Sequence, residues 1–523
     1  MIMGRTTPVL SLSMIVKDEG HTLAACLESV VGLVDEIVIA DTGSTDNTVA
    51  IARAFGATVI VIPWTGSFAD ARNACLGHCT GEWVLSLDAD ERLAPGQEQA
   101  VGKCLRQEGA GAFRLLITGN QTLSAGSVRQ TSAYPRLFRN DPRIRYEGRV
   151  HEQIGPSIVR LHMPIVPTAI RIEHTGYDRT LGEIQKKAER NLALLREEQR
   201  EHPDDWYVRA QIGTTLTLLD EHDAARSALE AALQGAIPPA GRAVVLNLLA
   251  ENALRAGVPD DAIRHCRESL RHAGTQIQAR WLLTGALMES GKFKMALAPL
   301  REIRRMTQGR QGNRDVSYDI LPDPGEVHML MARCHEELGD AGSAADEYLQ
   351  AIPSPAVRGS ALDGLVRLSS GQVTDTGITA QLERYVEQSP GDVRLLAGLA
   401  RVYRSRGDNA SAQHRLEHAM ILAPTDPSLF AIGISWHTRD SQLDQALQLL
   451  GEAEAASISS SELDRAALEL AVRIGDVPRA LILVDRILAS LPAGTTTIRD
   501  RLVAMKEKLL LQHTRRQSTE HPQ

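Results

Sequence analysis

Two aspartates separated by one residue follow a short apolar segment. Asp88 and Asp90 lie in the run 85–91, where an apolar strand is expected to end. Two carboxylates this close repel each other, and a hard divalent cation bound through carboxylates and substrate phosphates is the expected reason to tolerate them. A solvated acidic loop is the alternative, because such tripeptides are common. The motif alone leaves metal binding and an ordinary loop both open.

Polar residues also follow the other expected strands. The run 16–19 ends the first strand, and the run 41–46 places hydroxyl groups and a glycine where they could cap a helix or hold a ribose or base. Arg72 lies near a helix start and suits a diphosphate, although a helix-face ion pair is an equal use for it. The sequence has no phosphate-binding loop of the GxxxxGK[ST] or GxGxxG kind, so a nucleotide would bind by another geometry.

The elements that must position these residues alternate between strand and helix patterns. Strands are expected at 9–16, 36–40, 58–62 and 82–87, and helices at 21–33, 46–55 and 69–78. This alternation indicates βαβ units and a parallel sheet, whose ligands bind outside the carboxyl ends of the strands. Four further strands, expected to form an antiparallel extension, lie at 112–118, 135–139, 146–154 and 169–174. A charged helix at 181–199 then leads to a boundary at 202–205.

Beyond that boundary a small residue recurs, followed four residues later by a larger, mostly apolar one. The small residues are Ala225, Ala262, Ala296, Ala344, Ala412, Ala446 and Ala480. Three of the spacings are 34 residues, which is the tetratricopeptide period and predicts a solenoid of stacked helix pairs. The longer gaps, 296–344 and 344–412, require an inserted loop or a degenerate copy.

Composition bounds the remaining possibilities. The 523 residues carry a net charge of −8, which gives no general reason to bind nucleic acid, and the 4% aromatic content favours packed helix. The six scattered cysteines form no CxxC pair and are read as reduced thiols. No apolar run reaches the length of a membrane span, and we expect a cytoplasmic protein.

The ordered motifs resemble those of the family 2 glycosyltransferases, which have the GT-A fold. They comprise the runs 13–19, 39–48, 68–73 and 87–91, with later similarity at 136–140, 146–154, 172–177 and 187–191. The similarity covers roughly residues 9 to 205. It is strongest to the branch with tetratricopeptide repeats that includes sublancin-type peptide S-glycosyltransferases, and the lipopolysaccharide-core glucosyltransferases share much of the N-terminal pattern.

The resemblance implies an inverting sugar transfer from a nucleotide diphosphate donor, expected to be a UDP-sugar, with Mg²⁺ or Mn²⁺. By this resemblance Asp41 meets the base, Asp88 the ribose or metal-bound waters, and Asp90 the metal. Glu152 is the expected general base, with His151 as a third metal ligand beside Asp88 and Asp90 or as an alternative base. The residues expected to bind the nucleotide sugar are Val16, Asp18, Glu19, Asp41, Gly43, Ser44, Arg72, Asn73, Asp88 and Ala89.

Several other side chains have two readings. His174 is read as a structural histidine in preference to a site residue, and Trp64 as packing, although an aromatic ring could stack on a sugar. Arg139, Arg143 and Arg149 could line an acceptor site or simply be solvated.

The expected architecture is an α/β GT-A nucleotide-diphospho-sugar transferase domain at 1–178, a linker helix at 179–205, tetratricopeptide-like helical repeats at 206–512 and a flexible tail at 513–523. The repeats are expected to bind a peptide, protein or glycan acceptor, a protein partner or a second copy. A scaffold with a degenerate transferase domain and a sugar nucleotidyltransferase are the alternatives. The latter lacks its glycine-rich basic loop here, and the joint presence of Asp41, Arg72, Asp88 and Asp90 argues against decay.

Overall fold

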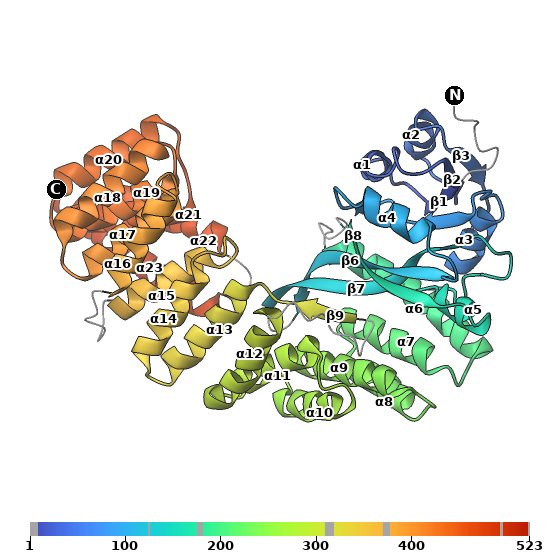
Figure 1. Ribbon diagram of the computed structural model, residues 1–523. Helices are drawn as coiled ribbons and strands as arrows, with labels where there is room; N and C mark the ends of the chain where they lie inside the picture. The colour runs from blue at the N-terminus through green and yellow to red at the C-terminus, as the bar shows by residue number, and fades with distance from the viewer. Residues whose placement is uncertain are drawn as a thin grey trace. The chain divides into compact units, whose positions relative to one another are not determined.

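The computed structural model contains two compact units, Met1–Gly339 and Asp340–Gln523, and each is described by itself (Figure 1). The first holds a mixed sheet and the first helices of the chain, and the elements described in the second are all helices. The described residues are 9–123, 126–174, 181–308, 318–369, 377–491 and 495–520.

Four parallel strands form one half of the sheet, in the order β3-β2-β1-β4. They are β1 (Leu10–Val16), β2 (Glu36–Asp41), β3 (Thr58–Val61) and β4 (Trp83–Ser86). The helices that connect them are α1 (Leu23–Glu28), α2 (Thr48–Ala54) and α3 (Phe68–Leu76). The predicted βαβ alternation is therefore confirmed, with helices shorter than the sequence pattern predicts.

The other half of the sheet continues β4-β7-β6-β8-β5. Its strands are β5 (Glu91–Leu93), β6 (Ala112–Leu123), β7 (Gly126–Arg139) and β8 (Ile165–His174), and two short helices that the sequence pattern did not predict are α4 (Glu98–Leu105) and α5 (Gly155–Arg160). Only residues 87–90 join β4 to β5, although three strands separate them in the sheet. The sheet must therefore curl to bring β5 back toward β4, and this puts Asp88 and Asp90 on the connecting turn.

The predicted strand at 146–154 is wrong. In this segment the only described pairing is an isolated bridge between Glu147 and Gln153, and Gly148 and His151 both have positive φ. Apolar side chains at 146, 150 and 154 imitate a strand pattern, but the backbone between them turns back on itself. The segment is a loop that enters α5.

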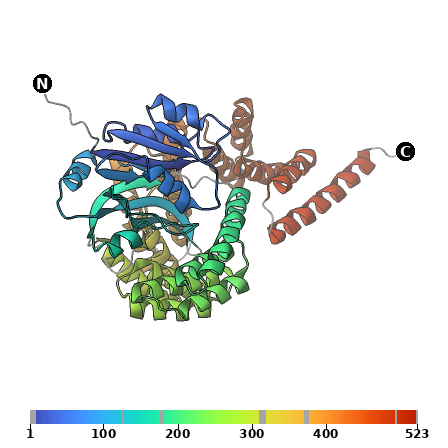
Figure 2. The ribbon, with the colours of Figure 1, turned by 90° about the vertical axis from the view of Figure 1, so that its right-hand side faces the viewer.

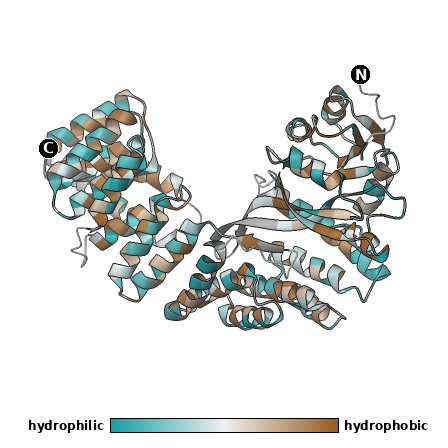
Figure 3. Cartoon of the chain, in the orientation of Figure 1, coloured by the Kyte–Doolittle hydropathy of each residue, from teal (hydrophilic) through white to brown (hydrophobic). Residues whose placement is uncertain are grey.

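Both faces of the parallel strands are buried, so their sequences are almost continuously apolar. Ile37 and Ile39 face a cluster that includes Leu23 of α1, while the alternate residues Val38 and Ala40 face a cluster that includes Cys75 of α3. Figure 3 shows hydrophobic residues on these strands and striped hydrophobic and hydrophilic faces on the helices. The two helical layers thus hold the strand ends, and the polar residues that follow them, in fixed positions.

Helices follow the sheet in both units. In the first unit they are α6 (Leu181–Glu201), α7 (Trp206–Leu218), α8 (His222–Leu233), α9 (Pro239–Arg255), α10 (Pro259–His272), α11 (Ile277–Glu289), α12 (Phe293–Gln308) and α13 (Pro324–Glu337). In the second they are α14 (Ala341–Ala351), α15 (Arg358–Ser369), α16 (Gly377–Gln388), α17 (Val393–Ser405), α18 (Asn409–Leu422), α19 (Pro427–Arg439), α20 (Leu443–Ala455), α21 (Ser461–Ile474), α22 (Val477–Ser490) and α23 (Thr496–Glu520).

The repeat pattern identified the packing positions of these helices. All seven marker alanines, from Ala225 to Ala480, lie on even-numbered helices and are fully buried. The gap from 344 to 412 contains a degenerate copy, since Ile378 of α16 lies 34 residues from both Ala344 and Ala412 and is buried. A large side chain has replaced the small one there, which hid the copy from a search for alanine.

The gap from 296 to 344 contains an insertion that carries a strand, β9 (Tyr318–Leu321). This strand pairs antiparallel with β7, with Ile320 opposite Gln130. A segment of the helical region therefore extends the mixed sheet, and no local sequence pattern predicted it.

Several smaller expectations concern this architecture. All six cysteines are buried and free of disulfide bonds in the structure, and their assignment as reduced thiols stays a prediction. Among the residues that the structure describes, no helix combines the length and the apolar character that crossing a membrane requires. The tail predicted at 513–523 falls partly on α23, which continues to Glu520, and residues 521–523 lie outside the described residues. The domain boundaries at 178 and 205 stay predictions.

Candidate functional site

The turn after β2 is built around the carboxylate of Asp41. This side chain is 3% exposed and accepts the backbone N–H groups of Gly43 at 3.2 Å and Ser44 at 3.1 Å. Gly43 has a φ of +105°, a conformation that favours glycine. The turn therefore closes directly at the carboxyl end of the strand.

The segment after β1 is tied to this turn. The backbone N–H of Asp18 donates to Ser44 Oγ at 2.9 Å, and Asp18 Oδ1 accepts the N–H of Thr45 at 2.7 Å. The N–H of Glu19 donates to Thr48 Oγ1 at 2.8 Å. The structure thus brings the residues predicted at the first two strand ends into one place, next to Val16, which is buried as the last residue of β1.

Arg72 connects two acidic residues that are far apart in the sequence. From α3, its Nη2 pairs with Asp88 Oδ1 at 2.6 Å, and its Nε pairs with Glu152 Oε1. The side chain is only 8% exposed, and its guanidinium lies 5.4 Å from the ring centre of Tyr146. The predicted base and the first aspartate of the acidic motif are therefore held by a single buried cation.

A second arginine, which the sequence analysis did not assign to the site, holds the other side of Asp88. Arg136 Nη2 lies 3.1 Å from Asp88 Oδ2 and 2.8 Å from Glu91 Oε1. Burial alone would raise the pKa of Asp88, but Arg72 and Arg136 lower it far below its ordinary value. A charged residue within the apolar strand pattern at 135–139 was the available signal.

Glu91 is the buried partner of this arrangement, with 1% exposure. Its Oε2 accepts the backbone N–H of Asp88 at 2.9 Å, which fixes the turn that carries the acidic motif. Burial raises the pKa of Glu91 to about 7, with Arg136 opposing the shift and Asp88 adding to it. Ala89, between the two aspartates, is also buried, so its packing against the core helps to fix the turn.

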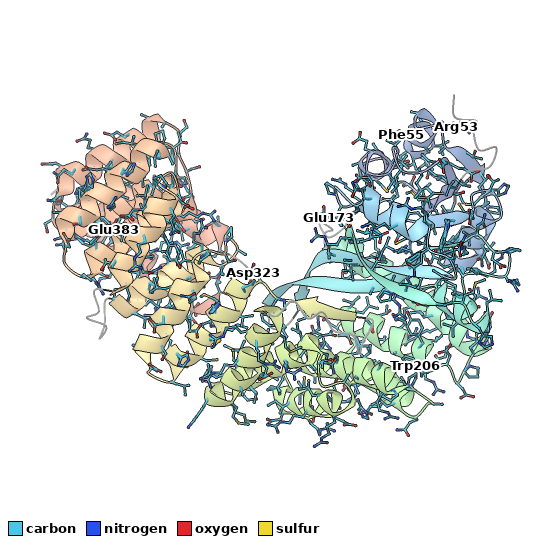
Figure 4. All side chains as sticks on the ribbon, viewed as in Figure 1. Arg53, Phe55, Glu173, Trp206, Asp323 and Glu383 are labelled. Carbon is cyan, nitrogen blue, oxygen red and sulfur yellow. The ribbon has the colours of Figure 1, made fainter. Side chains whose placement is uncertain are left out.

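Asp90 faces a histidine at the end of β8. His174 Nε2 lies 3.3 Å from Asp90 Oδ2, and the adjacent Glu173 is labelled in Figure 4. Burial would lower the pKa of His174, but the hydrogen bond to Asp90 and the charges of nearby carboxylates raise it. The structural reading of His174 therefore missed a direct contact with the acidic motif.

The loop that carries His151 and Glu152 starts from a pair of hydrogen bonds. Asn73 Nδ2 donates to the carbonyl of Tyr146 at 2.9 Å, and Asn73 Oδ1 accepts the N–H of Tyr146 at 2.8 Å. Glu152 points to Arg72, whereas His151 is exposed. The structure uses Asn73 to anchor the loop, and its predicted contact with the nucleotide sugar stays a prediction.

The predicted metal ligands are not brought together as one group. Within the described part of the chain, no three side chains from Asp, Glu, His and Cys are grouped to hold a metal ion, so Asp88, Asp90 and His151 do not form such a set. Asp88 is engaged by two arginines, and Asp90 contacts His174. The metal assignment stays a prediction.

The side chains with two readings have contacts of their own. Arg139 lies over the ring of Trp83 at 4.0 Å and pairs with Glu82, Arg143 pairs with Asp141, and Arg149 pairs with glutamates of α6. Trp64 packs edge-on against Phe68, with ring centres 4.8 Å apart. A role in acceptor binding stays a prediction for the three arginines, and stacking on a sugar stays the alternative for Trp64.

Comparison with known proteins identifies related sequences. Residues 11–146 match the family described as Glycosyl transferase family 2. A TPR repeat-containing protein of Synechococcus elongatus is 36% identical over 279 residues, which cover 52% of this chain and 68% of that protein. The prophage-derived glycosyltransferase SunS of Bacillus subtilis is 27% identical over 222 residues, 42% of this chain, and the match spans about half of SunS, 52%.

A crystal structure of S. aureus TarS 1-349 aligns with 50% of this chain and 91% of that one, at 16% identity and a TM-score of 0.30. The curled mixed sheet, the family match and the stacked helix pairs define a glycosyltransferase with a GT-A domain and tetratricopeptide repeats. The chain belongs to glycosyl transferase family 2 and carries tetratricopeptide repeats.

Proposed function

We propose that this glycosyltransferase moves a sugar, with inversion, from a UDP-sugar or another nucleotide diphosphate sugar to a peptide or glycan acceptor. One observation carries the proposal: the buried guanidinium of Arg72 contacts both Asp88 and Glu152. Asp88 lies on the turn expected to face the donor, and Glu152 lies on the loop expected to deprotonate the acceptor. One arginine side chain therefore contacts both the residue proposed for the donor and the residue proposed as the base.

The charges of the site suit a reaction that releases a diphosphate. The leaving diphosphate gains negative charge in the transition state, and fixed cations in a water-poor setting stabilise it. Arg72 and Arg136 are such cations, with 8% and 14% of their side chains exposed. The negative charge on the leaving group is the reason to expect both arginines to matter for the rate.

Two residues of the site, Asp90 and His174, could hold a divalent cation together with the oxygens of the diphosphate. The two arginines bind the other three carboxylates, which are Asp88, Glu91 and Glu152. Asp90 and His174 present an oxygen and a nitrogen 3.3 Å apart from two different elements, a donor pair that suits Mn²⁺ or Mg²⁺. We therefore propose His174, in place of His151, as the histidine that would hold the ion with Asp90. The bound ion would polarise the diphosphate.

The helical repeats are proposed to bind the acceptor, a protein partner or a second copy of the chain, because stacked helix pairs present extended surfaces. The six buried, unpaired thiols support a reducing compartment, and we propose the cytoplasm.

The experiment is donor hydrolysis and transfer. The full chain is mixed with a panel of UDP- and GDP-sugars and Mn²⁺, and released nucleotide diphosphate is measured. Asp90→Asn should lower turnover by roughly 100-fold or more, because it removes the charge that would hold the cation. Asp141→Asn is the matched control, since Asp141 pairs with Arg143 on the same domain. Absence of both hydrolysis and Mn²⁺-dependent nucleotide binding in the unmodified protein would refute the proposal.

A further inference from the structure

The loop that carries Glu152 is contacted by helices that follow the sheet. Glu198 of α6 is 8% exposed, and its Oε2 accepts the backbone N–H of Arg149 at 2.9 Å. Burial raises the pKa of Glu198, and the backbone N–H of Arg149 opposes the shift. The Arg149 side chain pairs with Glu201 of the same helix. In Figure 2 the teal-green helix α6 runs beside the sheet toward the green helices that follow.

The next helix holds the other end of the loop. Gln153 Nε2 donates to the hydroxyl of Tyr207 at 3.0 Å and to the carbonyl of His151 at 3.2 Å. Tyr207 lies in the first turn of α7, next to Trp206, labelled in Figure 4, and Asp205 caps this helix by accepting the N–H of Tyr207 at 2.8 Å. Burial raises the pKa of Tyr207, so its hydroxyl stays protonated at neutral pH.

Apolar packing fills the space between these two contacts. Val150 is 4% exposed and belongs to a cluster with Leu192 and Leu195 of α6 and Val208 and Ile212 of α7. Burial of this valine side chain stabilises the contact because it removes apolar surface from water. The two helices therefore contact the loop on both sides of His151 and Glu152, by backbone, side-chain and apolar contacts.

The sheet domain contacts the same loop as well. Asn73 holds its start at Tyr146, the N–H of Phe68 donates to the carbonyl of Arg149 at 2.9 Å, and Arg72 pairs with Glu152. Arg160 of α5 pairs with Glu147. His151 has a φ of +56°, a conformation that is uncommon for a residue with a Cβ and that the surroundings must hold in place. A carboxylate on such a loop keeps its position only while neighbouring elements fix the backbone.

We propose that α6 and α7 complete the transferase site, with Glu198 and Tyr207 as positioning residues that hold Glu152 in place for the acceptor. The assignment rests on the proposed function, because it matters for the rate only if Glu152 acts in transfer. Displacement of a reacting group by about 1 Å can lower a rate 100-fold. The first helices after the sheet are thus part of the catalytic unit and not only part of the repeat surface.

The test uses four variants of the full chain. Glu198→Ala and Tyr207→Phe remove the two acceptors, Glu198→Gln keeps an oxygen that can accept from Arg149, and Tyr385→Phe is the matched control. The Tyr385 hydroxyl donates to the carbonyl of Leu349 at 3.1 Å in the second unit, so its loss removes one hydrogen bond away from the loop.

Amide hydrogen exchange of the segment 147–153 is the first measurement. We expect exchange to become about tenfold faster in Glu198→Ala and in Tyr207→Phe, and to stay unchanged in Glu198→Gln and Tyr385→Phe. Transfer kinetics are the second measurement. The kcat should fall about tenfold in the first two variants while the KM for the donor changes less than about twofold.

Unchanged exchange in both Glu198→Ala and Tyr207→Phe would overturn the positioning role, and so would equal loss of kcat in Glu198→Gln. Changed exchange in a protein that neither hydrolyses nor transfers any donor sugar would refute the proposed function and leave the two helices as supports of this loop. The two failures are therefore distinguishable.

Discussion

Replacement of Arg72 by lysine should separate the two acidic residues that this arginine connects. The guanidinium offers several N–H groups in a planar fork, and here one edge binds Asp88 and the Nε side binds Glu152. A lysine ammonium is a single compact charge on a flexible chain, and it cannot reproduce both contacts in one position. Arg72→Lys therefore keeps the charge and removes the bridge.

The magnitude follows from what each carboxylate keeps. Asp88 keeps its ion pair with Arg136 at 3.1 Å, so it loses only one of its two charged partners. Glu152, whose side chain is 11% exposed, loses the partner that the structure shows for it. Breaking a buried pair and leaving one charge uncompensated costs about 3–5 kcal/mol, and the remaining lysine charge should reduce this to about 2–3 kcal/mol.

The assay is denaturant-dependent amide exchange of β4, which reports unfolding of the sheet domain separately from the second unit. Arg143→Lys is the matched control, because Arg143 pairs with Asp141 on the surface of the same domain with 65% of its side chain exposed. The control should leave the transition unchanged within error. An Arg72→Lys protein as stable as the Arg143→Lys protein would refute the bridging argument.

Three further predictions concern the base, the repeats and pH. Glu152→Gln should lower the transfer rate by about 100-fold or more with unchanged donor affinity, measured by nucleotide titration; a normal rate excludes it as the base. Gly364→Ala should destabilise the second unit by about 1–3 kcal/mol in urea unfolding, because the added Cβ would lie 2.4 Å from Tyr348. Gly359→Ala on the same helix is the control, since its Cβ meets nothing within 4 Å. Equal destabilisation by the two substitutions would contradict this explanation. Burial lowers the pKa of His265 below its ordinary 6.5, so the unfolded chain binds the proton more readily than the folded one, and folding loses stability as the pH falls below 6.5. His265→Gln should flatten this decline of the thermal unfolding midpoint with falling pH. An unchanged slope of midpoint against pH contradicts the assignment.

Local sequence patterns predicted the features that depend on neighbours along the chain. A period of 34 residues marked the packing alanines of the helix pairs, because each pair buries the same positions against the next. Apolar strands followed by polar turns predicted where Asp41 and Asp88 would lie, since the carboxyl ends of parallel strands share one edge of a sheet. Both patterns depend on residues close together in the sequence, and the family motifs lie at the strand ends that they predict.

Which distant side chains contact each other depends on the tertiary fold. Arg72 and Glu152 are 80 residues apart, and Arg136 and Asp88 are 48 residues apart. Their contacts depend on the curl of the sheet and on the register of β7 against β4, which no local pattern specifies. The segment 146–154 has a strand-like alternation, yet α6 and α7 hold it as a loop. Long-range packing, and not local propensity, therefore selected His174 over His151 as the neighbour of Asp90.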